Sequence, residues 1–131
     1  MRYLIATMLL CLFSFAAAQE LATVPEEFRG VYSVIARWHG DPEEVEDVSK
    51  LDFLPAKGTI EFRVDAGRML TNDTVAVFSS IQLHEGNTVI MFSGSEVLLL
   101  GSWKQDPNFA FLASLNTTTK KAHVFVCRIM Q

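Results

Sequence analysis

The sequence predicts an all-β domain, a small antiparallel up-and-down barrel of about eight strands with one short helix after the first strand. Apolar and polar residues alternate with a period of two from Lys57 onward, which is typical of half-exposed strands. Residues that favour turns separate these segments, and such short connections join antiparallel neighbours because a parallel crossover needs more chain. A two-layer β-sandwich remains the alternative architecture.

The N-terminus has the three parts of a secretory signal peptide. Arg2 supplies positive charge, residues 3–15 are apolar apart from two hydroxyl side chains, and Ala16-Ala17-Ala18 offers a cleavage site. The apolar run is shorter than the ~20 residues that span a bilayer. We therefore expect residues 1–18 to be removed, leaving an exported protein, secreted or periplasmic, with no integral membrane segment.

Residues 19–131 then form a single β-barrel-like domain. Cys127 is the only cysteine left in them, so an intramolecular disulfide is impossible and a buried thiol is expected. Without Arg2, ten basic residues stand against fifteen acidic ones, a formal charge of −5. The basic residues form no stripe, which argues against nucleic-acid binding.

The first strand is expected over residues 30–39, with alternate residues Tyr32, Val34, Ala36 and Trp38 on one face. Asp41 can cap a helix, Pro42 suits its first position, and Glu44 can complete a capping box. We expect two to three helical turns that end before Pro55. A calcium site among these acids is disfavoured, because no turn-forming glycine lies between them.

Further strands are expected at 57–65, 68–71, 74–84, 87–93, 96–104, 108–116 and 121–130. Separators such as Glu85-Gly86-Asn87 and Ser93-Gly94-Ser95 have turn chemistry. Two late strands carry apolar residues on both faces. This pattern favours a barrel that is also covered on its outside, by the helix or by a partner subunit.

The opening Gly30-Val31-Tyr32 and the late Arg128 resemble the calycin superfamily, which includes lipocalins and fatty-acid-binding proteins. In that superfamily a Gly-x-Trp motif begins the first strand, and a basic residue of the last strand packs over its ring. The resemblance implies a barrel-floor pair of Tyr32 and Arg128, with Val124, Val126 and Met130 also pointing inward. Here tyrosine replaces the usual tryptophan.

Catalytic and metal-binding motifs are missing from the sequence. His39, His84 and His123 lack metal-ligand spacing, so no metal site and no cofactor is predicted. Ser93-Gly94-Ser95 lies between strands and therefore predicts a hairpin rather than a nucleophile elbow. Arg37, His39 and Asp41 are the only polar cluster near an expected rim. We predict a protein that is not an enzyme.

Aromatic residues on inward faces predict an apolar cavity for a small hydrophobic ligand. The candidate ligand-binding residues are Tyr32, Trp38, Phe62 and Phe111. Sequons at Asn72 and Asn116 fall in expected turns and are candidate glycosylation sites. The alternative function is a filled core that works through its surface, as a protein-interaction module, an inhibitor or a homo-oligomer.

Overall fold

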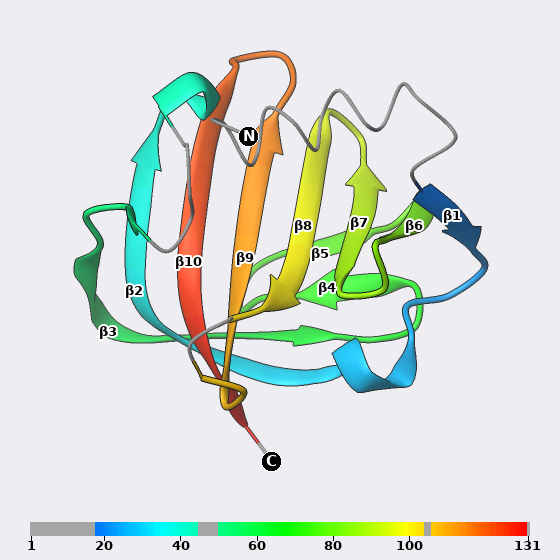
Figure 1. Cartoon of the computed structure of the whole chain (residues 1–131), viewed down its shortest axis with the longest axis horizontal. Coiled ribbons are helices and arrows are strands. Elements are labelled where there is room, and N and C mark those ends of the chain that lie inside the picture. Colours follow the sequence, from blue (N-terminus) through cyan, green and yellow to red (C-terminus); the bar gives the residue numbers. More distant parts are fainter. Residues whose placement is uncertain (1–17, 45–49, 104–105, 131) are drawn as a thin grey trace.

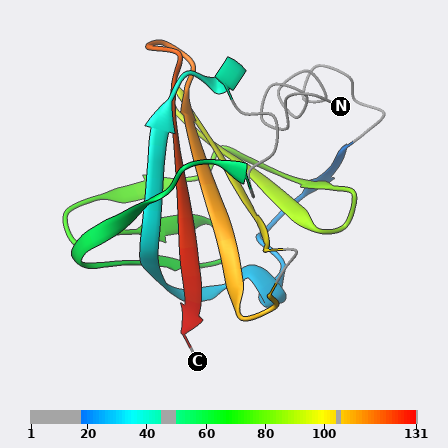
Figure 2. The ribbon, with the colours of Figure 1, turned by 60° about the vertical axis from the view of Figure 1, so that its left-hand side comes forward.

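The computed structural model describes residues 18–44, 50–103 and 106–130. These residues form ten strands of one curled antiparallel sheet, a half-barrel, and confirm the all-β class (Figures 1 and 2). The strands are β1 (Ala18–Leu21), β2 (Gly30–Gly40), β3 (Leu54–Val64), β4 (Arg68–Leu70), β5 (Val75–Val77), β6 (Ser80–His84), β7 (Thr88–Ser93), β8 (Glu96–Ser102), β9 (Phe109–Asn116) and β10 (Lys121–Met130). They are accompanied by the 3₁₀ turns η1 (Glu26–Phe28) and η2 (Pro42–Glu44).

The strand order is β1-β6-β7-β8-β9-β10-β2-β3-β4-β5. From β2 onward each strand pairs with its successor in the chain, except that β5 and β6 are not paired, and β10 returns to pair with β2. Only Phe78 and Ser79 join β5 to β6, although these strands stand near opposite ends of the order. This short link draws the two ends of the sheet together and curls it.

The link also corrects the prediction of one strand over 74–84, because the chain changes partners in the middle of that segment. The Phe78 N–H donates to the Gly67 carbonyl at 2.9 Å, whereas the Ser79 N–H donates to the Phe92 carbonyl at 2.8 Å. The predicted hairpin at Glu85-Gly86 is present. Three residues, 85–87, join the paired His84 and Thr88, and Glu85 with φ 55° and Gly86 with φ 77° supply the positive values that reverse the chain.

The capping pattern at Asp41 is confirmed. The Glu43 N–H donates to Asp41 Oδ1 at 3.1 Å, and the Asp41 N–H donates to Glu44 Oε1 at 3.1 Å. The described turn that follows is a 3₁₀ turn at Pro42–Glu44. The rest of the predicted helix falls largely on residues 45–49, outside the described residues.

A bulge interrupts β2 at Ile35. Val34 pairs with Cys127 of β10, whereas Ala36 pairs with Val126, so Ile35 is an extra residue opposite two consecutive partners. The pairing of β10 with β9 continues without a shift. An extra residue reverses which alternate side chains face each side. The prediction that Tyr32, Val34, Ala36 and Trp38 share one face is therefore wrong.

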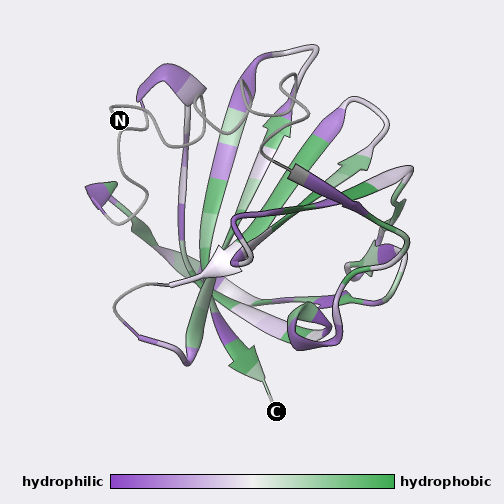
Figure 3. Cartoon of the chain, turned by 45° about the vertical axis from the view of Figure 1, so that its right-hand side comes forward, coloured by the Kyte–Doolittle hydropathy of each residue, from purple (hydrophilic) through white to green (hydrophobic). Residues whose placement is uncertain are grey.

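The sheet carries a core on each side. The concave core joins residues from strands near both ends of the order, which identifies it as the side that the sheet curls around. Its buried members are Val24, Phe28, Tyr32, Val34, Phe62, Val64, Ile81, Val89, Met91, Leu98, Leu100, Ala110, Leu112 and Cys127. In Figure 3 hydrophobic colour gathers along the central strands, and hydrophilic colour is concentrated at their ends and in loops.

The convex core lies on the opposite face of the central strands. Its buried members are Ile90, Val97, Leu99, Phe111, Ala113, Leu115, Ala122 and Val124. Trp38, Leu51, Phe53 and Trp103 pack against it from strand β2 and from two loops. The rings of Phe53 and Trp103 meet edge to face, with centroids 6.0 Å apart. Apolar residues on both faces of β8 thus have a packing partner on each side.

The predicted signal peptide lies outside the described residues except for Ala18, which begins β1. β1 pairs with β6, from Ala18 opposite His84 to Leu21 opposite Ile81. In the segment after β1, Val24 is fully buried in the concave core. Its N–H donates to the Ala66 carbonyl at 2.9 Å and holds the segment there.

Candidate functional site

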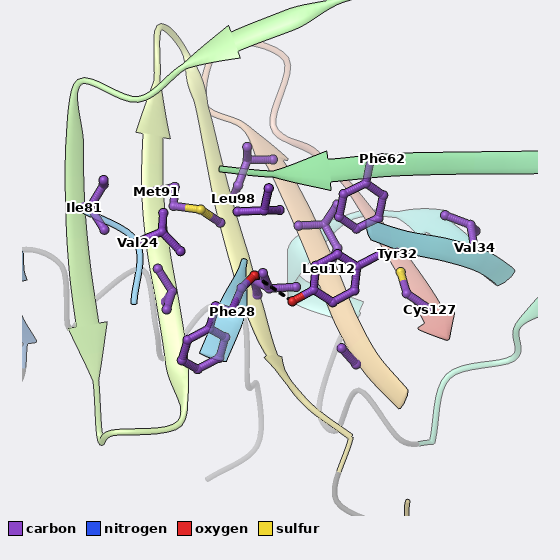
Figure 4. Packing of buried hydrophobic residues seen from close by; sticks show 14 residues of the cluster. Val24, Phe28, Tyr32, Val34, Phe62, Ile81, Met91, Leu98, Leu112 and Cys127 are labelled. Atoms are coloured by element: carbon purple, nitrogen blue, oxygen red, sulfur yellow. Dashed lines mark hydrogen bonds between the residues drawn. The ribbon is translucent and has the colours of Figure 1, made fainter. Parts of the chain in front are cut away.

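One end of the concave side is filled by aromatic side chains (Figure 4). Tyr32 of β2 stacks on Phe62 of β3, with ring centroids 5.1 Å apart and planes at 11°. The two residues are direct cross-strand partners, which places their side chains on one face. The Tyr32 hydroxyl donates to the Phe28 carbonyl at 2.7 Å. This bond satisfies a buried phenol and joins β2 to η1.

The segment before β2 closes the same end. Phe28 and Val24 lie within the concave core, and the Arg29 side chain donates through Nε to the Val24 carbonyl at 2.8 Å. In Figure 4 Phe28 and Val24 lie on the side of Ile81 and Met91, while Tyr32 lies towards Phe62. This end of the half-barrel is therefore occupied by protein side chains.

A cavity of about 150 Å³ remains beyond Phe62 on the same concave side. Strands β2, β3, β4, β8, β9 and β10 all contribute to it. Its lining residues are Val34, Ile60, Glu61, Phe62, Met69, Thr71, Glu96, Leu98, Leu112, Ser114 and Phe125. Most of these are apolar, and the few polar groups can orient a bound molecule. This is the usual composition of a small-molecule site.

The polar groups of the cavity have distinct positions. Ser114 stands opposite Leu98 in the β8–β9 register, so its hydroxyl adjoins the apolar wall. Glu96 is exposed, lies on the same face of β8 as Leu98, and places a carboxylate at the rim. Glu61 is the cross-strand partner of Ser33, so its side chain points to the face opposite Phe62. A carboxylate at the rim repels anions and favours neutral or cationic molecules.

The four predicted ligand-binding residues separate into two pairs. Tyr32 and Phe62 lie together in the concave core, and Phe62 lines the cavity. Trp38 and Phe111 belong to the convex core, on the other side of the sheet. Trp38 is there because the bulge reverses the faces of β2. Both were predicted wrongly as cavity residues.

Phe111 packs against its own sheet on the convex side. It is the cross-strand partner of Gly101, and a Cβ at Gly101 would come within 2.6 Å of the Phe111 ring. Only glycine leaves room for the ring to lie flat over the neighbouring backbone. The ring therefore serves sheet packing.

The predicted barrel-floor pair is absent. Arg128 pairs with Ser33, and Ile129 is the partner of Tyr32, so Arg128 and Tyr32 face opposite sides of the sheet. Arg128 is exposed, and its guanidinium lies 5.7 Å from the centroid of the Phe109 ring. Met130 is also exposed and Val124 lies in the convex core, so the predicted inward set on β10 is wrong. The odd-numbered residues Phe125, Cys127 and Ile129 face the concave side instead.

Cys127 is fully buried, as the sequence predicts. Burial raises the pKa of its thiol from 9.0 to about 12. Burial, and secondarily the nearby Cys127, raises the pKa of Tyr32 from 10.0 to about 12. Both groups are therefore neutral at physiological pH, and the thiol is poorly disposed to act as a nucleophile.

Of the polar cluster Arg37, His39 and Asp41, the first two line one hollow beside Asp52. Asp41 Oδ1 accepts the Glu43 N–H and so serves the turn. No group of three or more His, Cys, Asp or Glu residues in the described part of the chain is placed to hold a metal ion.

The closure of β10 onto β2 does bring His39 opposite His123, with ring centroids 5.9 Å apart. Sequence reasoning missed this pair, because it appears only when the first and last strands of the meander are aligned.

The two sequons lie at the surface in different settings. Asn72 is exposed beside Thr71. Asn116 is partly buried, and its Oδ1 accepts the N–H groups of Thr118 and Thr119 at 2.9 and 3.0 Å. The Asn116 side chain thus holds the β9–β10 turn, and the Asn72 side chain is the more accessible of the two.

No family model, no curated protein and no solved structure matches this chain. Among the residues described, no helix is long and apolar enough to cross a membrane. The concave cavity and the residues that line it are thus the features from which a function can be argued.

Proposed function

We propose that this protein binds a small, mainly apolar molecule in the concave cavity. The proposal rests on a cavity of about 150 Å³ that is lined by residues from six strands. An apolar cavity of about 150 Å³ is known to bind benzene in another protein, so this size suits a single ring or a short chain. A retinoid or a long lipid needs a larger pocket.

The polar lining narrows the class of ligand. Ser114 can donate or accept a hydrogen bond beside Leu98 and Leu112. Glu96 at the rim favours a neutral or cationic group over a carboxylate. We therefore propose a neutral or cationic single-ring compound, such as a phenol or an aromatic amine, as the ligand class.

Matched variants test this proposal. Leu112→Phe places a larger side chain into the cavity. Leu100→Phe is the matched control, because Leu100 is the cross-strand partner of Leu112 but does not line the cavity. Calorimetric titration with phenol and aniline should show binding to the wild type and at least about tenfold weaker binding to Leu112→Phe. Saturable binding to Leu112→Phe with wild-type affinity, or no binding to the wild type, would overturn the proposal.

We also propose export by cleavage after Ala18 and a distant relation to the calycin barrels. Pairing of the meander's last strand with its first supports the relation. N-terminal sequencing of the protein from the culture medium or periplasm should begin at Gln19. A chain that keeps residues 1–18 in its native host would contradict the export proposal.

A second candidate function, self-association, is favoured by one edge of the sheet. In the described part of the chain β5 pairs with β4 alone, and its residues Val75 and Val77 are 54% and 67% exposed. An exposed apolar edge strand is a template for another strand. We propose β5-to-β5 pairing between two copies. Light scattering should show a dimer that Val77→Lys dissociates, and a wild-type monomer at millimolar concentration would exclude it.

A further inference from the structure

His39 and His123 form a cross-strand pair that the cavity does not use. They are direct partners in the antiparallel β2–β10 register, and their ring centroids lie 5.9 Å apart at an interplanar angle of 57°. Directly opposed residues project their side chains to the same face. Both side chains are exposed and thus accessible to an ion from solvent.

The surroundings of the pair leave room for a bound ion. A hollow of about 350 Å³ is lined by His39, Gly40, Lys121, Ala122 and His123. The His123 ring also lies parallel to the Phe125 ring, with planes at 7° and centroids 6.3 Å apart. This stacking limits the orientations of one imidazole and reduces the entropy lost when a ligand is held.

We propose that His39 and His123 together bind a divalent late transition-metal ion, Cu²⁺ or Zn²⁺. Imidazole nitrogen suits these ions, and metal–nitrogen bonds are only about 2.0–2.1 Å long, so two opposed rings can turn one nitrogen each towards a shared ion. Neutral histidine is the form that binds metal, so metal binding weakens as the pH falls. Water completes the coordination, which makes the site open and weaker than a four-ligand structural site.

The positive charge of Lys121 lowers the expected metal affinity of this site. Lys121 lines the same hollow, and the described residues give it no ion-pair partner. Its positive charge opposes a metal cation. Replacement of Lys121 by glutamine should therefore strengthen metal binding. The same replacement would weaken binding if the hollow instead held an anion, so the sign of the change distinguishes the two ligands.

The experiment is an NMR titration of the untagged protein with ZnCl₂, followed by CuCl₂, at pH 7.5. The imidazole signals of His39 and His123 should shift with Zn²⁺ and broaden with Cu²⁺ at one ion per chain. The signals of His84, a buried residue of β6, provide the internal reference and should stay in place. Mg²⁺, which prefers oxygen ligands, should have no effect.

Variants complete the test. His39→Ala and His123→Ala should each lower the Zn²⁺ affinity at least about tenfold, because each removes one of two ligands. Lys121→Gln should raise it. Unchanged His39 and His123 signals, retention of affinity in either alanine variant, or weaker binding by Lys121→Gln would overturn the proposal.

Discussion

Val34 and Trp38 lie four residues apart on β2 yet belong to cores on opposite sides of the sheet. In a regular strand they would share a face, because side chains alternate with a period of two. The extra residue, Ile35, reverses the alternation between them. One bulge thereby lets β2 supply Tyr32 to the concave core and Trp38 to the convex core.

Deletion of Ile35 should destabilise the protein strongly. The deletion restores regular alternation, so either Trp38 or Val34 must leave its core. We expect a loss of about 3 kcal/mol or more in the free energy of unfolding, comparable to truncation of a buried aromatic residue. Urea denaturation checks this. Ile35→Thr, at the same 39% exposed position, should cost less than about 1 kcal/mol. Equal losses in the two variants would contradict the role of the bulge.

The sequence predicted those parts of the fold that local chemistry determines. The turn at Glu85-Gly86, the cap at Asp41 and most strand positions follow from residues close together in the chain. The bulge at Ile35 could not be read from the pattern, because an extra apolar residue leaves the apparent alternation intact. The pairing of β1 with β6 was missed for a related reason, since it joins segments that are distant in sequence.

The candidate site was only partly predictable for the same reasons. Of the four candidate ligand-binding residues, Phe62 lines the cavity, whereas Tyr32 is packed beside it in the concave core. The faces predicted for Trp38 and Arg128 were wrong because the register between β2 and β10 shifts by one residue at the bulge. Leu112 and Ser114, which line the cavity, carry no sequence signal that separates them from ordinary strand residues.

Phe28→Ala should open the filled end of the concave side. Phe28 is 8% exposed and contributes its ring to the concave core. We expect a loss of about 3–5 kcal/mol, the usual cost for a buried phenylalanine. Phe109→Ala provides the control, because Phe109 is only partly buried beneath Arg128, and it should cost much less. Thermal unfolding of both variants measures the difference, and a larger loss for Phe109→Ala would refute the assignment.

The stability of the protein should fall above pH 9. The pKa of Cys127 is raised in the folded protein from 9.0 to about 12, so between these values the unfolded thiol ionises while the folded thiol stays protonated. The folded state then binds more protons than the unfolded state. The free energy of unfolding consequently decreases by up to about 1.4 kcal/mol per pH unit for this group. Below pH 9 its contribution is fully present.

Cys127→Ala isolates this effect. Urea denaturation between pH 7 and pH 11 gives the free energy of unfolding of both proteins. Above pH 9 this free energy should decline more steeply with pH for the wild type than for the variant. The loss of packing in the variant lowers its stability equally at every pH and does not affect the slope. Parallel curves over that range would show that Cys127 does not titrate as proposed.

The cavity predicts that substitution by phenylalanine costs less stability at Leu112 than at its cross-strand partner Leu100. Leu112→Phe should leave stability within about 1 kcal/mol of the wild type, because the added carbons enter existing space. Leu100→Phe should lose about 1–3 kcal/mol, because Leu100 is fully buried and does not line the cavity. Chemical denaturation measures both. A greater loss for Leu112→Phe would mean that the cavity lacks room.

The most direct test of ligand binding is methyl NMR of the protein titrated with phenol. Leu98 and Leu99 are adjacent on β8, but Leu98 lines the cavity and Leu99 lies in the convex core. We predict saturable shifts at the methyl groups of Leu98 and Leu112, with little change at Leu99. Absence of saturable shifts at Leu98 and Leu112, or equal shifts at Leu99, would contradict the assignment of the concave cavity as the binding site.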